Sequence, residues 1–269
     1  MELVKILDRR LGRLIPSITP HLNPDPSVLK FSDYRPKAVP LPALKPYSNW
    51  AKYSQKPWGM LGNDTSGDCT CAAVGHAVQV VTSCAGIEAK VTDAEIITMY
   101  EASGYVPGNP STDNGWYIQN ALQYWQTTGV GGHKIAGFIA INPHNMQDVD
   151  LAIQLFGFVN IGILLPVSAQ NQNGIWTVPE GGPNGNGAPG SWGGHSIIAT
   201  TRSPFRREII TWGQSGWKVS ENFWLDYVDE CWTAFTMDWL KKSGDSPSGF
   251  DKAALLSDMS ALGMQTPAS

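Results

Sequence analysis

Residues 62–77, GNDTSGDCTCAAVGHA, place a cysteine directly after an aspartate in a glycine-rich loop, and small apolar residues follow at once. The next residues, AAVGHAVQVV from Ala72 to Val81, predict a buried helix, and the polar loop before it offers N-cap residues. Cys69 would then lie in the first turn of the helix, where unpaired amides and the helix dipole favour a thiolate. The stretch therefore predicts either a nucleophile or a small buried thiol.

A cysteine nucleophile needs a general base, and His195 is distinctive among the five histidines. It follows two glycines and begins the apolar strand SIIAT, although a histidine on a strand can also be a hydrogen-bonded core residue. His21 lies in a proline-rich region, His133 in a glycine turn and His144 beside a proline, so turn or solvated roles are expected for them. His76 belongs to the predicted helix and is expected to be packed.

The composition predicts a chain that folds by itself, as one large domain or two small subdomains: 269 residues, 42% hydrophobic and 16% charged. The net charge of -4 and the lack of a basic run longer than a pair argue against nucleic acid as a partner. The apolar stretch FGFVNIGILLPV is shorter than the ~20 residues that a membrane helix needs. The N-terminus has no secretory signal pattern, so we expect a cytoplasmic protein, or one within a particle assembled there.

The cysteines predict neither disulfides nor a metal. There are four of them, and Cys69 and Cys71 are separated by a single residue, which suits neither a disulfide framework nor a common zinc spacing. A metal site from Cys69, Cys71, His76 and Cys84 is the alternative, but that spacing would strain tetrahedral ligation. Because the chain also lacks a GxGxxG or P-loop pattern, no cofactor is expected.

The order of predicted elements favours an α+β fold, in which a helical layer faces an antiparallel sheet. Helices are expected at 91–102, capped by Thr92 or Asp93 with Glu95 in the first turn, and at 115–129 and 146–157. A strand is expected at 158–166. After a long Gly/Pro/Asn loop at 178–194, further strands are expected at 195–202, 207–213 and 221–228.

Three regions are expected along the chain. Residues 1–48 form an extended, proline-rich arm with a possible short helix at 2–15. Residues 49–240 form the main domain, with a mainly helical half at 49–145 and a mainly sheet half at 146–240. Residues 241–269 form a peripheral tail with one weak amphipathic segment, FDKAALLSDMSALG.

From Asn49 to about Phe235 the chain resembles the papain-like cysteine peptidases. SNWAKYSQKPWGMLGNDTSGDCTCAA resembles the start of their mature domain, and counting back six residues from Cys69 places Asn63 where the family has its oxyanion-hole glutamine. GDCTC departs from the family signature Cys-Gly-Ser/Ala-Cys-Trp/Tyr. Later pieces follow in the family's order: VTDAEIITMYEA, DNGWYIQNALQYWQTTGV, MQDVDLAIQLFGFVNIGILL, GGHSIIAT and ITWGQSGW.

The resemblance implies a helical subdomain packed against an antiparallel β-sheet or barrel subdomain, with a cleft between them. It implies that Cys69 attacks a carbonyl and that His195 transfers the proton. Asn63 and the backbone N–H of Cys69 would bind the oxyanion, and Trp212 would shield the histidine, without metal or cofactor. Sheet packing is the alternative role for Trp212.

The sequence departs from the family at the third catalytic position, where Ile210 replaces an asparagine. Thr211 is adjacent, but strand alternation is expected to point its side chain to the opposite face. A Cys-His dyad is therefore expected. Asp229 and Glu230 are the nearest acidic candidates to orient the imidazole, with a solvated strand end as the alternative.

The resulting functional hypothesis is a cysteine peptidase, a papain-like thiol hydrolase, or a related amide-bond acyltransferase acting on a peptide or protein. The alternative is a weakly active or inactive papain-fold structural or binding protein, for example a component of a viral assembly. The N-terminal arm would cover the cleft as a propeptide does, or dock an assembly partner. The glycine-rich stretch 178–194 would shape the rim of the cleft or be a disordered loop.

Overall fold

The structure is a computed structural model that describes residues 11–13, 29–34, 43–240, 246–248 and the single residues 253, 257 and 260. The helix expected at 2–15 lies outside the described residues except at 11–13, where the chain is not helical. The amphipathic segment 250–263 also lies outside them, apart from the three single positions.

Helix α3 (Cys69–Ala85) is the central element of the helical half, and almost all of its residues are buried. It ends at Gly86, whose φ of 100° is the left-handed conformation that glycine adopts readily. Helices α4 (Asp93–Glu101) and α5 (Ile118–Thr127) lie beside it. Thr92 and Glu95 form the expected capping box of α4, so the predicted helices of this half are confirmed.

The sheet half is built on one sheet of seven strands in the described part of the chain, in the order β2-β9-β3-β5-β7-β8-β4. All neighbours are antiparallel except β4 and β8. The strands are β2 (Gly137–Ala140), β3 (Val159–Leu165), β4 (Ile175–Trp176), β5 (Gly193–Ala199), β7 (Arg206–Thr211), β8 (Gln214–Ser220) and β9 (Val228–Phe235).

The strand expected at 221–228 is wrong, because these residues form helix α7 (Glu221–Tyr227) and β9 begins only at Val228. The Ser220 side chain accepts a hydrogen bond from the Phe223 N–H and caps the helix. Phe223 and Tyr227, four residues apart, are both buried on one helical face. The aromatic residues that suggested a strand therefore pack at helical spacing.

The remaining elements lie around this frame. They are α2 (Phe31–Tyr34), α6 (Met146–Phe156), the strand pair β1 (Ser48–Asn49) and β6 (Thr201–Arg202), and the 3₁₀ helices η1 (Ala51–Tyr53), η2 (Pro110–Thr112), η3 (Val167–Asn171), η4 (Gly185–Gly187) and η5 (Met237–Trp239). The expected helix at 146–157 and strand at 158–166 are confirmed as α6 and β3. No helix in the described residues is long and apolar enough to cross a membrane.

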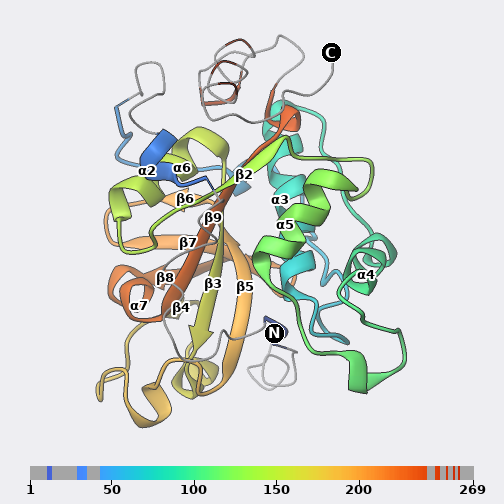
Figure 1. The fold of residues 1–269 in the computed structure, drawn as a ribbon. Helices are drawn as coiled ribbons and strands as arrows, with labels where there is room; N and C mark the ends of the chain where they lie inside the picture. Colours follow the sequence, from blue (N-terminus) through green and yellow to red (C-terminus); the bar gives the residue numbers. More distant parts are fainter. Residues whose placement is uncertain are drawn as a thin grey trace.

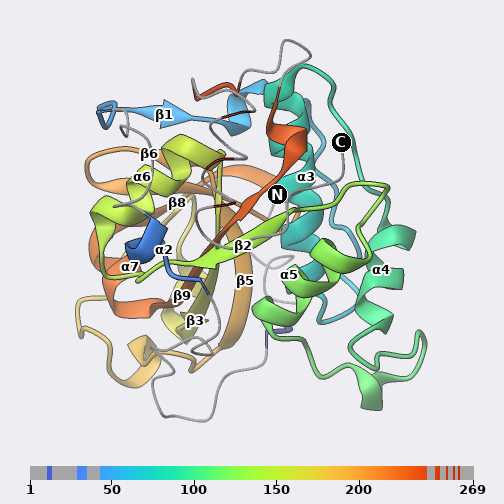
Figure 2. The ribbon, with the colours of Figure 1, turned by 45° about the horizontal axis from the view of Figure 1, so that its top comes forward.

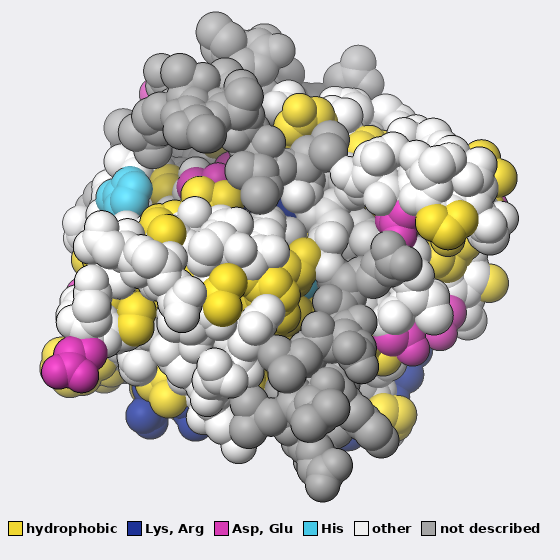
Figure 3. Space-filling model, turned by 90° about the horizontal axis from the view of Figure 1, so that it is seen from below, with side chains coloured by type: hydrophobic (Ala, Val, Ile, Leu, Met, Phe, Trp, Pro, Cys, Tyr) yellow, Lys and Arg dark blue, Asp and Glu magenta, His cyan; other side chains and the backbone are white. Residues whose placement is uncertain are grey.

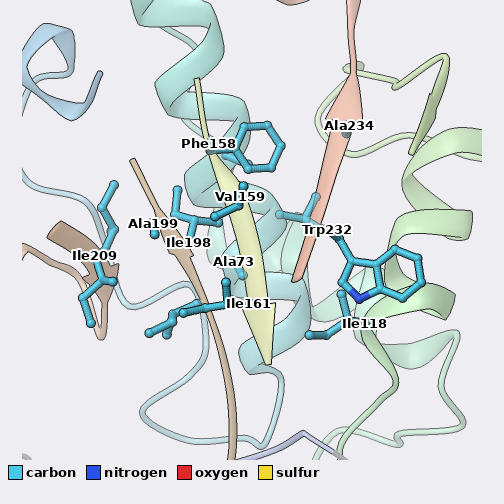
Figure 4. Close-up of a cluster of buried hydrophobic side chains, with 14 of the residues drawn as sticks. Ala73, Ile118, Phe158, Val159, Ile161, Ile198, Ala199, Ile209, Trp232 and Ala234 are labelled. Atoms are coloured by element: carbon cyan, nitrogen blue, oxygen red, sulfur yellow. The ribbon is translucent and has the colours of Figure 1, made fainter. Parts of the chain in front are cut away.

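Figures 1 and 2 show the expected α+β arrangement: α3, α4 and α5 gather on one side, and the sheet with α6 and α7 on the other. The apolar core fills the space between the two sides. Figure 4 shows part of this core, with Ile161 on β3, Ile198 on β5 and Ala73 on α3 among its buried side chains. Burial of this surface at roughly 25 cal/mol per Å² holds the two halves together.

A buried polar network fixes two loops of the helical half. The Asp113 carboxylate accepts hydrogen bonds from the Gly67 N–H at 2.8 Å and from the Tyr100 hydroxyl at 2.9 Å. The same hydroxyl accepts from the Gly115 N–H at 2.8 Å. The loop that precedes α3 and the turn that precedes α5 are thus joined through one tyrosine.

We predict that Tyr100→Phe lowers the free energy of unfolding by roughly 1–3 kcal/mol, because the buried Gly115 N–H loses its partner. Urea denaturation measures the change. Tyr105→Phe is the matched control, since its ring stacks on Tyr100 at 4.7 Å and the ring is retained; a change within about 0.5 kcal/mol is expected. Equal losses in the two variants would contradict the role given to the Tyr100 hydroxyl.

Candidate active site

Cys69 is the first residue of α3 and lies against the sheet half. Its side chain is buried, and its Sγ accepts a hydrogen bond from the Ser196 N–H on β5 at 3.3 Å. The contact joins the helical half to the sheet half at the position expected for the nucleophile.

His195 is also buried, on β5 directly before Ser196. The Trp212 ring lies almost parallel to the imidazole, with ring centroids 4.6 Å apart and planes inclined by 18°. The imidazole Nε2 lies 2.9 Å from the Thr211 Oγ1. Its Nδ1 is buried and makes no hydrogen bond with the described residues.

The structure brings the four expected site residues together around one small cavity. Its volume of about 10 Å³ admits at most one water molecule, so there is no room for a substrate in this form. The cavity is lined from both halves, by Met60, Asn63, Cys69, Ala72, Ala73, His76, His195, Ser196, Ile197, Ile210, Thr211 and Trp212.

Asn63 is buried in the loop before α3, and its amide donates a hydrogen bond to the Ser66 carbonyl at 3.2 Å. Asp68, the residue before the helix, is buried in the same loop. Burial raises the pKa of its carboxyl well above the usual range, and the side chains of Asn63 and Ser66 oppose that shift. In this form the Asn63 amide therefore helps to hold the loop.

The expectation for Thr211 is wrong, because its side chain lies on the same face of the sheet as His195. Ile198 pairs with Ile210 across β5 and β7, and continuing this register sets Thr211 opposite Ile197. Ile197 and His195 are alternate residues of β5 and share a face. Thr211 thus contacts the imidazole, one position later than the family spacing indicated.

A two-residue turn places the tryptophan over the histidine. Thr211 pairs with Gln214, so Trp212 and Gly213 form the connection between β7 and β8. Both have positive φ, 47° and 67°, as a type I′ turn requires. A left-handed conformation is uncommon for tryptophan, and here it holds the indole against the imidazole.

The expectations for Asp229 and Glu230 are also wrong, because these residues neither orient His195 nor form a solvated strand end. They pair with Arg13, whose guanidinium lies 2.8 Å from Asp229 and 2.9 Å from Glu230. The Arg13 side chain has no exposed surface, whereas those of Asp229 and Glu230 are 28% and 19% exposed.

Residues 11–13 cross the site between the two halves. The Gly12 carbonyl accepts a hydrogen bond from the Trp116 N–H at 2.9 Å, and the Arg13 N–H donates to the Gly194 carbonyl at 3.3 Å. The Gly12 backbone also hydrogen-bonds Cys69, which favours the thiolate. A Cβ on Gly12 would overlap the Gly67 carbonyl oxygen, so only glycine fits between this loop and the thiol.

Burial opposes the charged forms of both reactive groups. It raises the pKa of the Cys69 thiol to about 12, against the hydrogen bonds from Ser196 and Gly12. It lowers the pKa of His195 to about 3, and the Arg13 charge acts in the same direction. The activation expected from the helix N-terminus is therefore outweighed in the covered site, which holds a neutral thiol and a neutral imidazole.

Among the described histidines and cysteines, only His76 lines the cavity besides Cys69 and His195. His76 is packed as expected, with Nε2 3.2 Å from the Gly59 carbonyl, and burial lowers its pKa to about 4. The His133 Nδ1 lies 2.9 Å from Asp238, and His21 lies outside the described residues. The four cysteines are free thiols. Among the described residues no cluster of potential ligands is placed to hold a metal ion.

Comparison with known proteins finds no matching family model and no matching curated protein. Solved structures do match. Xylellain, a cysteine protease from Xylella fastidiosa, has a TM-score of 0.62 at 14% identity, covering 86% of this chain and 97% of its own. Procathepsin L 3 of the Tenebrio molitor larval midgut has a TM-score of 0.57 at 11% identity, covering 87% and 79%.

A third match is procathepsin B from Trypanosoma congolense, with a TM-score of 0.54 at 8% identity over 88% of this chain and 89% of that one. At such low identity the likeness concerns the fold. The architecture expected from the sequence is therefore confirmed, and the chain has a papain-like fold.

Proposed function

We propose that the protein is a cysteine peptidase, a thiol hydrolase with Cys69 as nucleophile and His195 as general base. The observation that carries the proposal is the meeting of these two residues around one cavity, with the Ser196 N–H on the sulfur and the Trp212 ring on the imidazole. The fold, shared with cysteine proteases, supports the same class of chemistry.

In the proposed reaction the Cys69 thiol proton passes to His195 Nδ1, and the sulfur bonds to the carbonyl carbon of a peptide bond. The C–N bond then breaks, and Nδ1–H gives its proton to the leaving amine. Water attacks the resulting thioester, Nδ1 accepts a water proton, and the C–S bond breaks as that proton returns to sulfur. An amine in place of water would make the enzyme an acyltransferase.

Thr211 fits a positioning role in this scheme. When its Oγ1 accepts the Nε2–H, the imidazole is held in the tautomer that leaves the Nδ1 lone pair available. The hydroxyl would do the work that an asparagine does in the family, with a shorter side chain and from the adjacent position.

Asn63 and the backbone N–H of Cys69 are the proposed oxyanion donors. The amide now donates to Ser66, so it would have to exchange that hydrogen bond for one to the substrate oxygen. Loss of such a donor typically costs about 10²–10³ in rate. Because Asn is one methylene shorter than Gln, this exchange requires the loop before α3 to move towards the substrate.

The covered, uncharged site also favours a second candidate, a papain-fold binding or structural protein with weak or no turnover. The N-terminal arm would then serve to dock an assembly partner, and the chain would work in the cytoplasm or in a particle formed there. The two candidates differ in what happens when residues 11–13 are displaced from Cys69, because only a peptidase then hydrolyses peptides.

We predict that Cys69 in the unmodified chain reacts with iodoacetamide far more slowly than glutathione at pH 7. With a pKa of about 12, only about 10⁻⁵ of this thiol is ionised at that pH, and the ionised fraction rises tenfold per pH unit up to the pKa. Arg13→Glu would set a third carboxylate against Asp229 and Glu230, and should raise the rate at pH 7 by at least tenfold. Mass spectrometry of the labelled peptide measures both rates.

Peptide hydrolysis by the Arg13→Glu chain should require both reactive residues. We predict that adding Cys69→Ala or His195→Ala abolishes product formation from a peptide library, read by mass spectrometry for hydrolysed and ligated products. Cys84→Ala is the matched control, since this buried thiol does not line the cavity and donates to the Trp50 carbonyl at 3.4 Å. Absence of product from every chain would favour the binding protein.

Thr211→Val removes the hydroxyl but keeps the side-chain size, and we predict that kcat/KM falls about 5- to 10-fold, the value of one neutral hydrogen bond. Thr211→Ser restores the hydroxyl and should recover most of the activity. An equal loss in both variants, or no loss in either, would contradict the positioning role.

A further inference from the structure

Asp229 and Glu230 form an acidic pair whose carboxylates are held in place by neighbouring protein groups. Both residues lie near the start of β9, and the Trp232 Nε1–H donates to the Glu230 Oε2 at 3.1 Å. Arg13 Nη1 and Nη2 each contact one carboxylate oxygen of Asp229, and Nη1 also donates to the Glu230 Oε1.

The space beside Asp229 and Glu230 fits a planar cation. A Cβ on Gly162 of β3 would overlap the Arg13 Nη1, so this glycine leaves the space that the guanidinium occupies. A fork of N–H donors suits two carboxylates better than the single point charge of a lysine. The fit therefore favours arginine over lysine.

The two carboxylates give the site an affinity for cations. Asp229 and Glu230, whose side chains are only 28% and 19% exposed, share the Arg13 guanidinium, so departure of Arg13 would take one cation away from two largely buried carboxylates. Loss of an ion-pair partner in such a position is costly, which favours refilling by another cation. On the described part of the face in Figure 3 acidic and basic side chains lie scattered.

The backbone beside Arg13 is held as a bound peptide would be. Gly12 and Arg13 hydrogen-bond to Trp116 and Gly194, one from each half of the molecule, next to the thiol. A cavity of about 710 Å³ continues from the carboxylates and gives space for more residues; Tyr117, Asn120 and Trp232 line it. A ligand chain can therefore fill the pocket and extend past it.

We propose that Asp229 and Glu230 form a specificity pocket for an arginine side chain of the substrate, and that Arg13 occupies it as an internal competitor. The inference rests on the proposed peptidase function in so far as it calls the ligand a substrate. The pocket itself is tested by binding alone. A substrate peptide with arginine in this pocket would have to displace residues 11–13 before its carbonyl could reach Cys69.

The binding experiment uses the full chain with Arg13→Ala to empty the pocket and Cys69→Ala to prevent turnover. The probes are acetyl-LGRLIP-amide, which copies residues 11–16, and the same peptide with citrulline, a neutral isostere, in place of arginine. Calorimetry should show at least tenfold tighter binding of the arginine peptide. Restoring Arg13 should weaken that binding at least tenfold.

Asp229→Asn with Glu230→Gln, in the same background, should bring the two peptides to equal affinity. Asp226→Asn is the matched control, since it is an exposed acidic residue of α7, and it should keep the preference. Equal affinity for the two peptides before the acidic pair is changed would overturn the inference.

The same peptides separate this inference from the proposed function. With Cys69 intact and Arg13→Ala, preferential cleavage of arginine peptides supports both. Binding preference without cleavage supports the pocket and removes the peptidase, whereas cleavage without an arginine preference overturns the pocket alone. If Arg13→Ala fails to unfold cooperatively, Asp229→Asn with Glu230→Gln in the unmodified chain decides: Cys69 alkylation should rise at least tenfold, and an unchanged rate overturns the inference.

Discussion

The contact between the first turn of α3 and the middle of β5 is the constraint on which the site depends. A helix that begins at Cys69 and a strand that carries His195 and Ser196 come from separate halves, and the hydrogen bond from Ser196 to the sulfur marks where they meet. Small residues on α3 allow this close approach, since Ala72 and Ala73 line the same cavity. Larger side chains there would hold the nucleophile away from the base.

Burial is the stronger of the two opposing influences on the thiol. The helix terminus and two backbone donors favour the thiolate, yet removal from water outweighs them and keeps the sulfur protonated. The imidazole is affected in the opposite sense by the same cause. Access of water and ligand to Cys69 and His195 therefore controls the ionisation of both groups, and Gly12 lies directly beside the thiol.

Much of the fold could be predicted from the sequence because its signals are local. The capping box at Thr92, the glycine after α6 and the apolar run of β3 each identify an element from neighbouring residues. Pairing across strands is not local, so the side of the sheet on which Thr211 lies required the register with β5. Arg13 gave no signal at all, because its partners lie more than 200 positions away. The aromatic residues of α7 suggested a strand because their pattern fits both periods.

The orientation of the Gly12 backbone bears on whether Cys69 could cleave the segment of residues 11–13. Its amide contacts the Cys69 sulfur, while its carbonyl oxygen accepts the hydrogen bond from the Trp116 N–H. The Gly12 carbonyl oxygen is thus held by Trp116 and not by the proposed oxyanion donors, Asn63 and the Cys69 N–H. Attack of Cys69 on this carbonyl would therefore first require the hydrogen bond to Trp116 to break.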